Sequence, residues 1–149
     1  MDIGMVQRHL ADIAASKTAY QQAVQEITQA LSKVDTDART STDELHSWLG
    51  VAYAGLGDAP RAISEGQKGM EMRTTSEDPF EGPVREEQMA QIYALLGNAD
   101  VAIPILRKWI HVPSANDITP AMLRIEPIWD PIRNDPRFQE LVSEGGFGK

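Results

Sequence analysis

Cysteine is absent from the 149 residues of this chain. The chain therefore has no disulfide bond, no thiolate metal ligand and no cysteine nucleophile, and its composition suits a reducing compartment. Basic residues are also scarce, because 14 lysines and arginines stand against 22 acidic residues, for a formal net charge of −8. This balance argues against binding of nucleic acid or of an anionic membrane surface, since both require a basic face.

A signal peptide and a long apolar run are missing as well. The N-terminal stretch MDIGMVQRHLADIAAS has an acidic residue where a signal peptide has basic ones. No window approaches the roughly 20 apolar residues of a membrane helix. We therefore expect a soluble, cytoplasmic protein, and the length of 149 residues favours a single domain.

Motifs of catalysis and of cofactor binding are not found. His9, His46 and His111 lie far apart, and none has a second histidine three or four residues away. The glycines form neither a dinucleotide nor a phosphate loop, and no serine lies in a nucleophile elbow. The acidic pair Glu86 and Glu87 falls where the start of a helix favours negative charge. We therefore predict a protein that is not an enzyme and that has no metal or cofactor.

What the chain does contain is an internal repeat. LGVAYAGLGDAPRAI at residues 49–63 and MAQIYALLGNADVAI at residues 89–103 align at an offset of 40. Tyrosine, leucine, glycine, alanine and isoleucine occupy equivalent positions in the two copies. Apolar residues recur at helical spacing on both sides of the glycine, so each copy predicts two amphipathic helices.

The residues between the paired helices predict tight turns. Gly57 and Gly97 suit the left-handed conformation that ends a helix. Asp58 and Asn98 follow them and can cap the next helix, and Pro60 then falls in its first turn, where its missing N–H does no harm. Each copy is therefore predicted to form a helical hairpin.

This pattern resembles the tetratricopeptide repeat, a helix-turn-helix unit of about 34 residues. A weaker third copy, TAYQQAVQEITQALSKVD at residues 18–35, has Thr18 in place of the turn glycine. A rival interpretation treats residues 5–34 as one long helix, because its apolar residues follow alternating steps of four and three that only Lys17 interrupts. We favour two helices, at residues 3–16 and 19–34.

The predicted fold is all-α: a single domain over residues 1–149 that resembles a tetratricopeptide superhelix. It comprises three helical hairpins and a C-terminal helical cap. The predicted hairpins are residues 3–34 (helices 3–16 and 19–34), 42–73 (helices 42–56 and 59–73) and 83–111 (helices 83–96 and 99–111).

The cap is predicted at residues 119–143, because this segment is too apolar to remain uncovered and the end of a repeat stack needs a cover. Trp129 and Phe138 are expected to cover the third hairpin. Three Asp/Thr-Pro pairs predict short helical turns, each with a capping residue followed by proline. The pairs are Thr119-Pro120, Asp130-Pro131 and Asp135-Pro136, and the turns are 120–125, 130–133 and 136–143.

The segment ITPAMLRIEPIWDPIRNDPRFQELV also resembles the closing part of repeat regions at the C-terminus of large bacterial signalling proteins. Those proteins carry a protein kinase, a winged-helix DNA-binding domain or a cyclase upstream. The resemblance implies that this chain is a piece of such a protein.

In the tetratricopeptide family the first helix of each hairpin lines an inner groove that binds extended peptides or partner helices. The resemblance therefore implies a partner-binding groove in this chain. The best-known tail-binding version uses lysines and asparagines to hold a terminal carboxylate, and neither occurs at the equivalent positions here, so we expect a mixed or basic ligand. The predicted groove residues are Arg8, Asp12, Ser47, Trp48, Val51, Glu87 and Gln91.

The predicted function is that of a protein–protein interaction scaffold, a regulatory module of a larger bacterial signalling or transcription-regulating protein. Its partner is expected to be a protein or peptide, including an upstream domain of the same parent chain. The alternative is homo-oligomerisation, in which the N-terminal hairpin pairs with a second copy because its outer apolar face has no polar cap.

Overall fold

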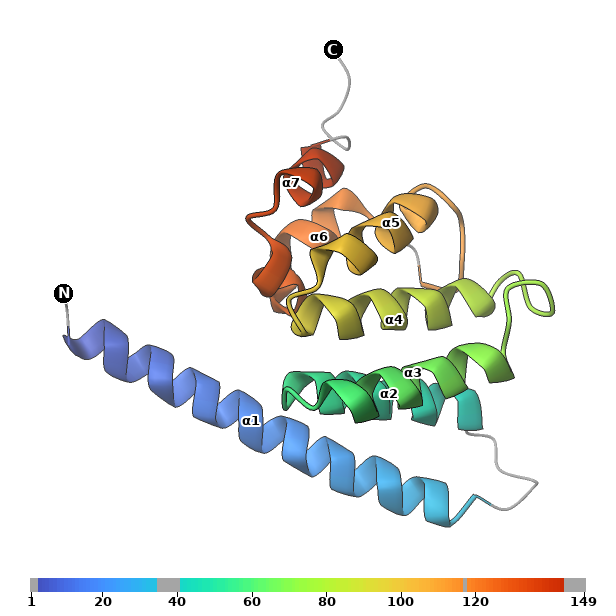
Figure 1. The fold of residues 1–149 in the computed structure, drawn as a ribbon, viewed down its shortest axis with the longest axis horizontal. Coiled ribbons are helices and arrows are strands. Elements are labelled where there is room, and N and C mark those ends of the chain that lie inside the picture. The colour runs from blue at the N-terminus through green and yellow to red at the C-terminus, as the bar shows by residue number, and fades with distance from the viewer. Residues whose placement is uncertain (1–2, 35–40, 117, 144–149) are drawn as a thin grey trace.

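The computed structural model describes the backbone of residues 3–34, 41–116 and 118–143, and the side chains of these ranges from residue 15 onward. Every regular element in these ranges is a helix (Figure 1): seven are α-helices and one, η1, is a 3-10 helix. The predicted all-α fold class is therefore confirmed. Within the same ranges, no helix is both long enough and apolar enough to span a membrane.

The first element, α1, is one continuous helix over Ile3–Ser32. The prediction of two helices, and with it that of an N-terminal hairpin at residues 3–34, is wrong. The physical reason lies in the sequence, because residues 5–34 contain neither glycine nor proline and Thr18 does not end a helix as a glycine does. Lys17 stays exposed. The C-terminal half of α1 lies along α2, while the N-terminal half extends away from the other helices (Figure 1).

Two helical hairpins follow, and α4 packs against both helices of the first. Their helices are α2 (Thr42–Gly55), α3 (Ala59–Met72), α4 (Gly82–Leu95) and α5 (Ala99–Trp109). These bounds agree within two residues with the predicted hairpins at 42–73 and 83–111. Only three residues join the two helices of each hairpin, so the helices run antiparallel.

The two hairpin turns have the same backbone geometry. Gly57 has a φ of 78° and Gly97 a φ of 74°, which is the left-handed region that favours glycine. Asp58 accepts a hydrogen bond from the backbone N–H of Arg61 at 3.2 Å, and Asn98 accepts one from that of Val101 at 3.3 Å. Both predicted caps are confirmed, so the repeat seen in the sequence is a repeat of local structure.

Glycine also permits a close approach between α2 and α3. A Cβ atom added at Gly50 would lie 2.8 Å from the carbonyl oxygen of Ala62 and 2.8 Å from the backbone nitrogen of Gly66. Any larger residue at position 50 would push the two helices apart. The α2–α3 pair is therefore packed backbone against backbone at this point.

A buried ion pair network joins the two hairpins. The carboxylate of Asp43 on α2 accepts a hydrogen bond from Arg73, at the end of α3, at 2.9 Å and one from Arg85 on α4 at 2.8 Å. Both Asp43 and Arg85 are buried. Although burial alone would raise the pKa of Asp43, the hydrogen bonds from the two arginines outweigh it and hold that pKa below its ordinary value.

The chain closes with three short helices: α6 (Pro120–Ile125), η1 (Pro127–Ile132) and α7 (Pro136–Ser143). Thr119 caps α6 as predicted, because its hydroxyl accepts a hydrogen bond from the backbone N–H of Met122 at 3.2 Å. The middle turn begins at Pro127 rather than at residue 130, so Asp130 lies inside η1 and does not cap it.

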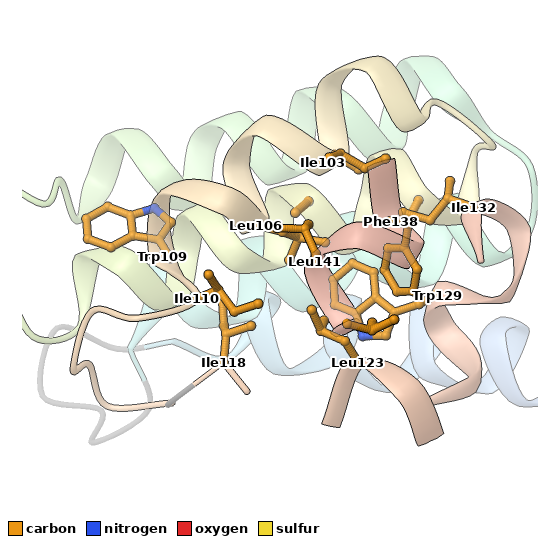
Figure 2. Close-up of a cluster of buried hydrophobic side chains, with 14 residues drawn as sticks. Ile103, Leu106, Trp109, Ile110, Ile118, Leu123, Trp129, Ile132, Phe138 and Leu141 are labelled. Atoms are coloured by element: carbon orange, nitrogen blue, oxygen red, sulfur yellow. The ribbon is translucent and has the colours of Figure 1, made fainter. Parts of the chain in front are cut away.

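These three helices cover the outer face of the α4–α5 hairpin. Trp129 and Phe138 are completely buried, with ring centroids 6.5 Å apart. They belong to one apolar cluster with Ile103 and Leu106 of α5 and Leu123 of α6 (Figure 2). The predicted helical cap is therefore present.

Candidate partner-binding groove

A groove of about 520 Å³ runs along α2 and α4. Glu44 and Trp48 line it from α2, and Glu87 and Gln91 line it from α4. The opposite wall comes from the segment that follows α5, which places Asn116 against α4. We call this feature the α2–α4 groove.

The start of the cap completes the groove. Met122 of α6 and Glu126, which precedes η1, belong to its lining. These residues are more than thirty positions away from Glu87 in the sequence. The cap thus shapes one end of the groove as well as covering the core.

Three of the predicted groove residues meet here, namely Trp48, Glu87 and Gln91. Ser47 and Val51 do not line it; both are buried, and Val51 packs in the apolar cluster shared by α2 and α4. Ser47 directly precedes Trp48, and one residue turns a helix face by about 100°. The side chains of Arg8 and Asp12, also predicted, lie outside the described residues.

Glu87 has an unusual environment for a carboxylate. It is 4% exposed, and its hydrogen-bond partners are two amides: Asn116 Nδ2 at 2.7 Å and Gln91 Nε2 at 3.4 Å. Burial, helped by the negative charge of Glu126, raises the pKa of Glu87 to about 7 even though the two hydrogen bonds act to lower it. At neutral pH this carboxyl group is therefore divided between its protonated and ionised forms.

The preceding residue, Glu86, shows the opposite behaviour. Its carboxylate accepts hydrogen bonds from Lys108 at 2.8 Å, from the Trp109 indole at 2.9 Å and from Thr75 at 2.9 Å. Burial again favours the neutral form, but these three donors outweigh it and lower the pKa of Glu86. Glu86 is satisfied within the protein, whereas Glu87 is buried and has no cation as a partner among the described residues.

Gln91 carries an unsatisfied hydrogen-bond acceptor. Gln91 is 8% exposed, its Nε2 donates to Glu87, and its Oε1 has no partner among the described residues. Leaving a buried acceptor without a donor costs about 1–3 kcal/mol. The lining of the groove therefore contains a buried acceptor for which the described residues supply no donor.

The charge of the groove is negative. Four carboxylates line it, those of Glu44, Glu81, Glu87 and Glu126. The guanidinium of Arg85 also lies there, but its Nε donates to Asp43 at 2.8 Å and its Nη1 donates to Gln88 at 2.5 Å. Arg85 is thus engaged in the hairpin junction and does not neutralise Glu87.

Trp48 provides the aromatic surface of the groove. Its side chain is 43% exposed, although a tryptophan is usually far more buried. A half-exposed tryptophan beside carboxylates can bind a partner that is cationic or that presents both polar and apolar groups.

No family model, curated protein or solved structure matches this chain. Within the described part of the chain, no three histidine, aspartate or glutamate side chains are grouped so that they could hold a metal ion.

A second, larger cavity of about 820 Å³ lies between α1 and the cap. Tyr20, Leu56 and Ile128 are among its lining residues, and its walls are mainly apolar. Among the described side chains, the buried acceptors without a partner are on Ser47 and Gln91, and neither lines this cavity. The α2–α4 groove is therefore the better candidate for selective binding.

Proposed function

We propose that this chain is a helical-repeat interaction module of the tetratricopeptide type, in which the α2–α4 groove binds a segment of a protein partner. The observation that carries the proposal is the composition of the groove, in which a half-exposed Trp48 lies among carboxylates and beside an unsatisfied acceptor on Gln91. The residues of the repeat and the turn geometry at Gly57 and Gly97 support the family.

Catalysis is not part of the proposal. A carboxyl group with a pKa near neutrality, such as that of Glu87, is also what a general base requires. Its contacts are the side-chain amides of Asn116 and Gln91, which supply neither a nucleophile nor an acid. This environment supports a role of Glu87 in recognition of a partner.

The parent protein is proposed to be a bacterial signalling or transcription-regulating protein, with the module in the cytoplasm. This rests on the likeness of the C-terminal segment to the closing part of such repeat regions and on the lack of cysteine. The partner is then a protein or peptide, including another domain of the same parent.

Site-specific photo-crosslinking tests the groove as the binding surface. p-Benzoylphenylalanine is placed at Met122, which lines the groove, and in a matched variant at Met72, which is 53% exposed on α3 and lies outside it. We expect a discrete protein adduct at position 122 that is absent at position 72. The captured protein should bind the purified chain and lose affinity when Trp48 is replaced by alanine.

Two results would contradict this proposal. Equal adducts at both positions would mean that the contacts are unspecific. An adduct at Met122 whose formation is unchanged by Trp48→Ala would mean that the groove residues do not select the partner.

A second candidate is self-association through α1. The helix packs against α2 on one side, and its apolar side chains at coiled-coil spacing, Tyr20, Val24, Ile27 and Leu31, remain only partly buried. Sedimentation equilibrium should then show a dimer that Val24→Glu converts to a monomer. A strictly monomeric wild-type chain at high concentration excludes this candidate.

A further inference from the structure

The residues inside the α2–α4 groove indicate which chemical group of the partner binds there, a point that the proposed function leaves open. Two buried residues of its lining have unmet needs among the described residues: Glu87 is a carboxylate without a cation, and Gln91 Oε1 is an acceptor without a donor. Both needs are met by one chemical group, a positively charged N–H donor. Trp48 lines the same groove and offers an aromatic face, to which cations are attracted.

We propose that the α2–α4 groove contains a binding site for one arginine side chain of the protein partner. This inference rests on the proposed function, because it assumes that the groove binds a polypeptide. The guanidinium would donate to the carboxylate of Glu87 and, once the Gln91 side-chain amide rotates to expose it, to Gln91 Oε1, and its plane would lie against the indole of Trp48.

Arginine fits these requirements better than lysine. A guanidinium has five N–H donors in a fixed planar arrangement, so it can satisfy a carboxylate and an amide oxygen at once and still stack on an aromatic ring. A lysine ammonium is a compact, strongly hydrated charge that loses more solvation on entering a buried site. The groove offers a carboxylate, an amide oxygen and an indole together, which is the set that a guanidinium uses.

Binding of the guanidinium is coupled to the ionisation of Glu87. Burial holds the pKa of the free Glu87 carboxyl at about 7, and a cation in contact with it favours the ionised form. Binding below neutrality therefore releases a proton, and affinity rises with pH. The charged groups around Glu87 are Glu44 of α2, Glu81 and Arg85 at the start of α4, and Glu126 before η1. No histidine lines the groove among the described residues.

The test uses the full chain and three short peptides that differ at one side chain. The probe is acetyl-Gly-Ala-Arg-Ala-Gly-amide, and its two counterparts carry citrulline or lysine in place of arginine. Binding is followed by NMR through the Trp48 indole N–H and the Gln91 side-chain amide. We expect saturable shifts with the arginine peptide and affinity about tenfold lower with the citrulline peptide, because citrulline keeps the shape but loses the charge.

The pH dependence supplies the second measurement. Affinity for the arginine peptide should rise between pH 6 and 8, by up to about tenfold per pH unit below the pKa of Glu87. Glu87→Gln should weaken binding about tenfold and remove the pH dependence. Glu71→Gln, which removes the same charge from an exposed position on α3, is the matched control and should change neither.

The outcomes separate this inference from the proposed function. Equal shifts with all three peptides would overturn the arginine site while leaving the groove as a peptide-binding surface. Equal affinity for the arginine and lysine peptides would overturn the guanidinium assignment. Absence of any shift with the arginine peptide would also overturn the inference, whereas the proposed function stands or falls on the crosslinks at Met122.

Discussion

The buried carboxyl group of Glu87 makes the stability of the protein depend on pH in a way that one substitution should abolish. The ordinary pKa of 4.5 applies in the unfolded chain, and burial raises the pKa to about 7 in the folded one. The folded state thus holds the proton more tightly. Its stability is complete below pH 4.5 and falls as the pH rises through 7. At about 1.4 kcal/mol per pH unit, the loss approaches about 3 kcal/mol by pH 8.

Glu87→Gln keeps the shape of the side chain and removes its charge. The new amide oxygen can accept the hydrogen bond from Asn116, and its NH2 group can donate to Gln91 Oε1 once the Gln91 amide rotates. The variant should therefore unfold like the wild type near pH 4.5 and be more stable by about 3 kcal/mol at pH 8. Urea unfolding followed by circular dichroism at several pH values measures this difference.

The comparison between wild type and variant cancels the titration of the other acidic residues. A stability difference that does not change between pH 4.5 and 8 would refute the account of Glu87. So would a variant that is less stable than the wild type at pH 8. Glu71→Gln again provides the control, because Glu71 is exposed and its replacement should leave the pH profile unchanged.

Three further substitutions test the fold, each by urea unfolding. Gly57→Val should lower the free energy of unfolding by more than about 1 kcal/mol through backbone strain alone, since nothing lies within 4 Å of an added Cβ. Gly57→Asn should lower it less, and equal losses for the two variants would contradict the left-handed turn geometry. Trp129→Ala should cost about 3–5 kcal/mol because the side chain is completely buried, and an unchanged midpoint would contradict the capping role. Asp43→Asn should lower the free energy of unfolding by about 3–5 kcal/mol, because the buried charge of Arg85 then lacks the carboxylate that it pairs with. Replacing Arg85 by methionine in the same variant should restore part of this stability.

The helical hairpins could be predicted because their turns are encoded locally. Gly57 and Gly97 supply the backbone conformation, and Asp58 and Asn98 supply the caps, all within a few residues of the turn. The same reasoning failed for α1. There an apparent third copy of the repeat predicted a turn near Thr18, although residues 5–34 contain no glycine or proline that would end a helix.

The groove could be predicted only in part. Glu87 and Gln91 lie four residues apart on α4, so the sequence indicates that they share a face. Asn116 and Glu126 come from segments beyond α5, and only tertiary packing brings them to Glu87. The burial of Glu87, and hence its raised pKa, was not visible either, because a Glu-Glu pair at a helix start is usually solvated.

The junction at Asp43 bears on how the protein unfolds. In a stack of repeats each unit touches only its neighbours, so units at the ends can open separately. Here the carboxylate of Asp43 is shared by Arg73 at the end of α3 and Arg85 within α4. Opening the first hairpin would leave the buried Arg85 without Asp43, and opening the second would leave Asp43 with Arg73 alone. The two hairpins are therefore held in a single cooperative unit, and their amide protons should exchange through the same opening reaction, whereas α1, which packs chiefly on α2, is free to exchange through a smaller one.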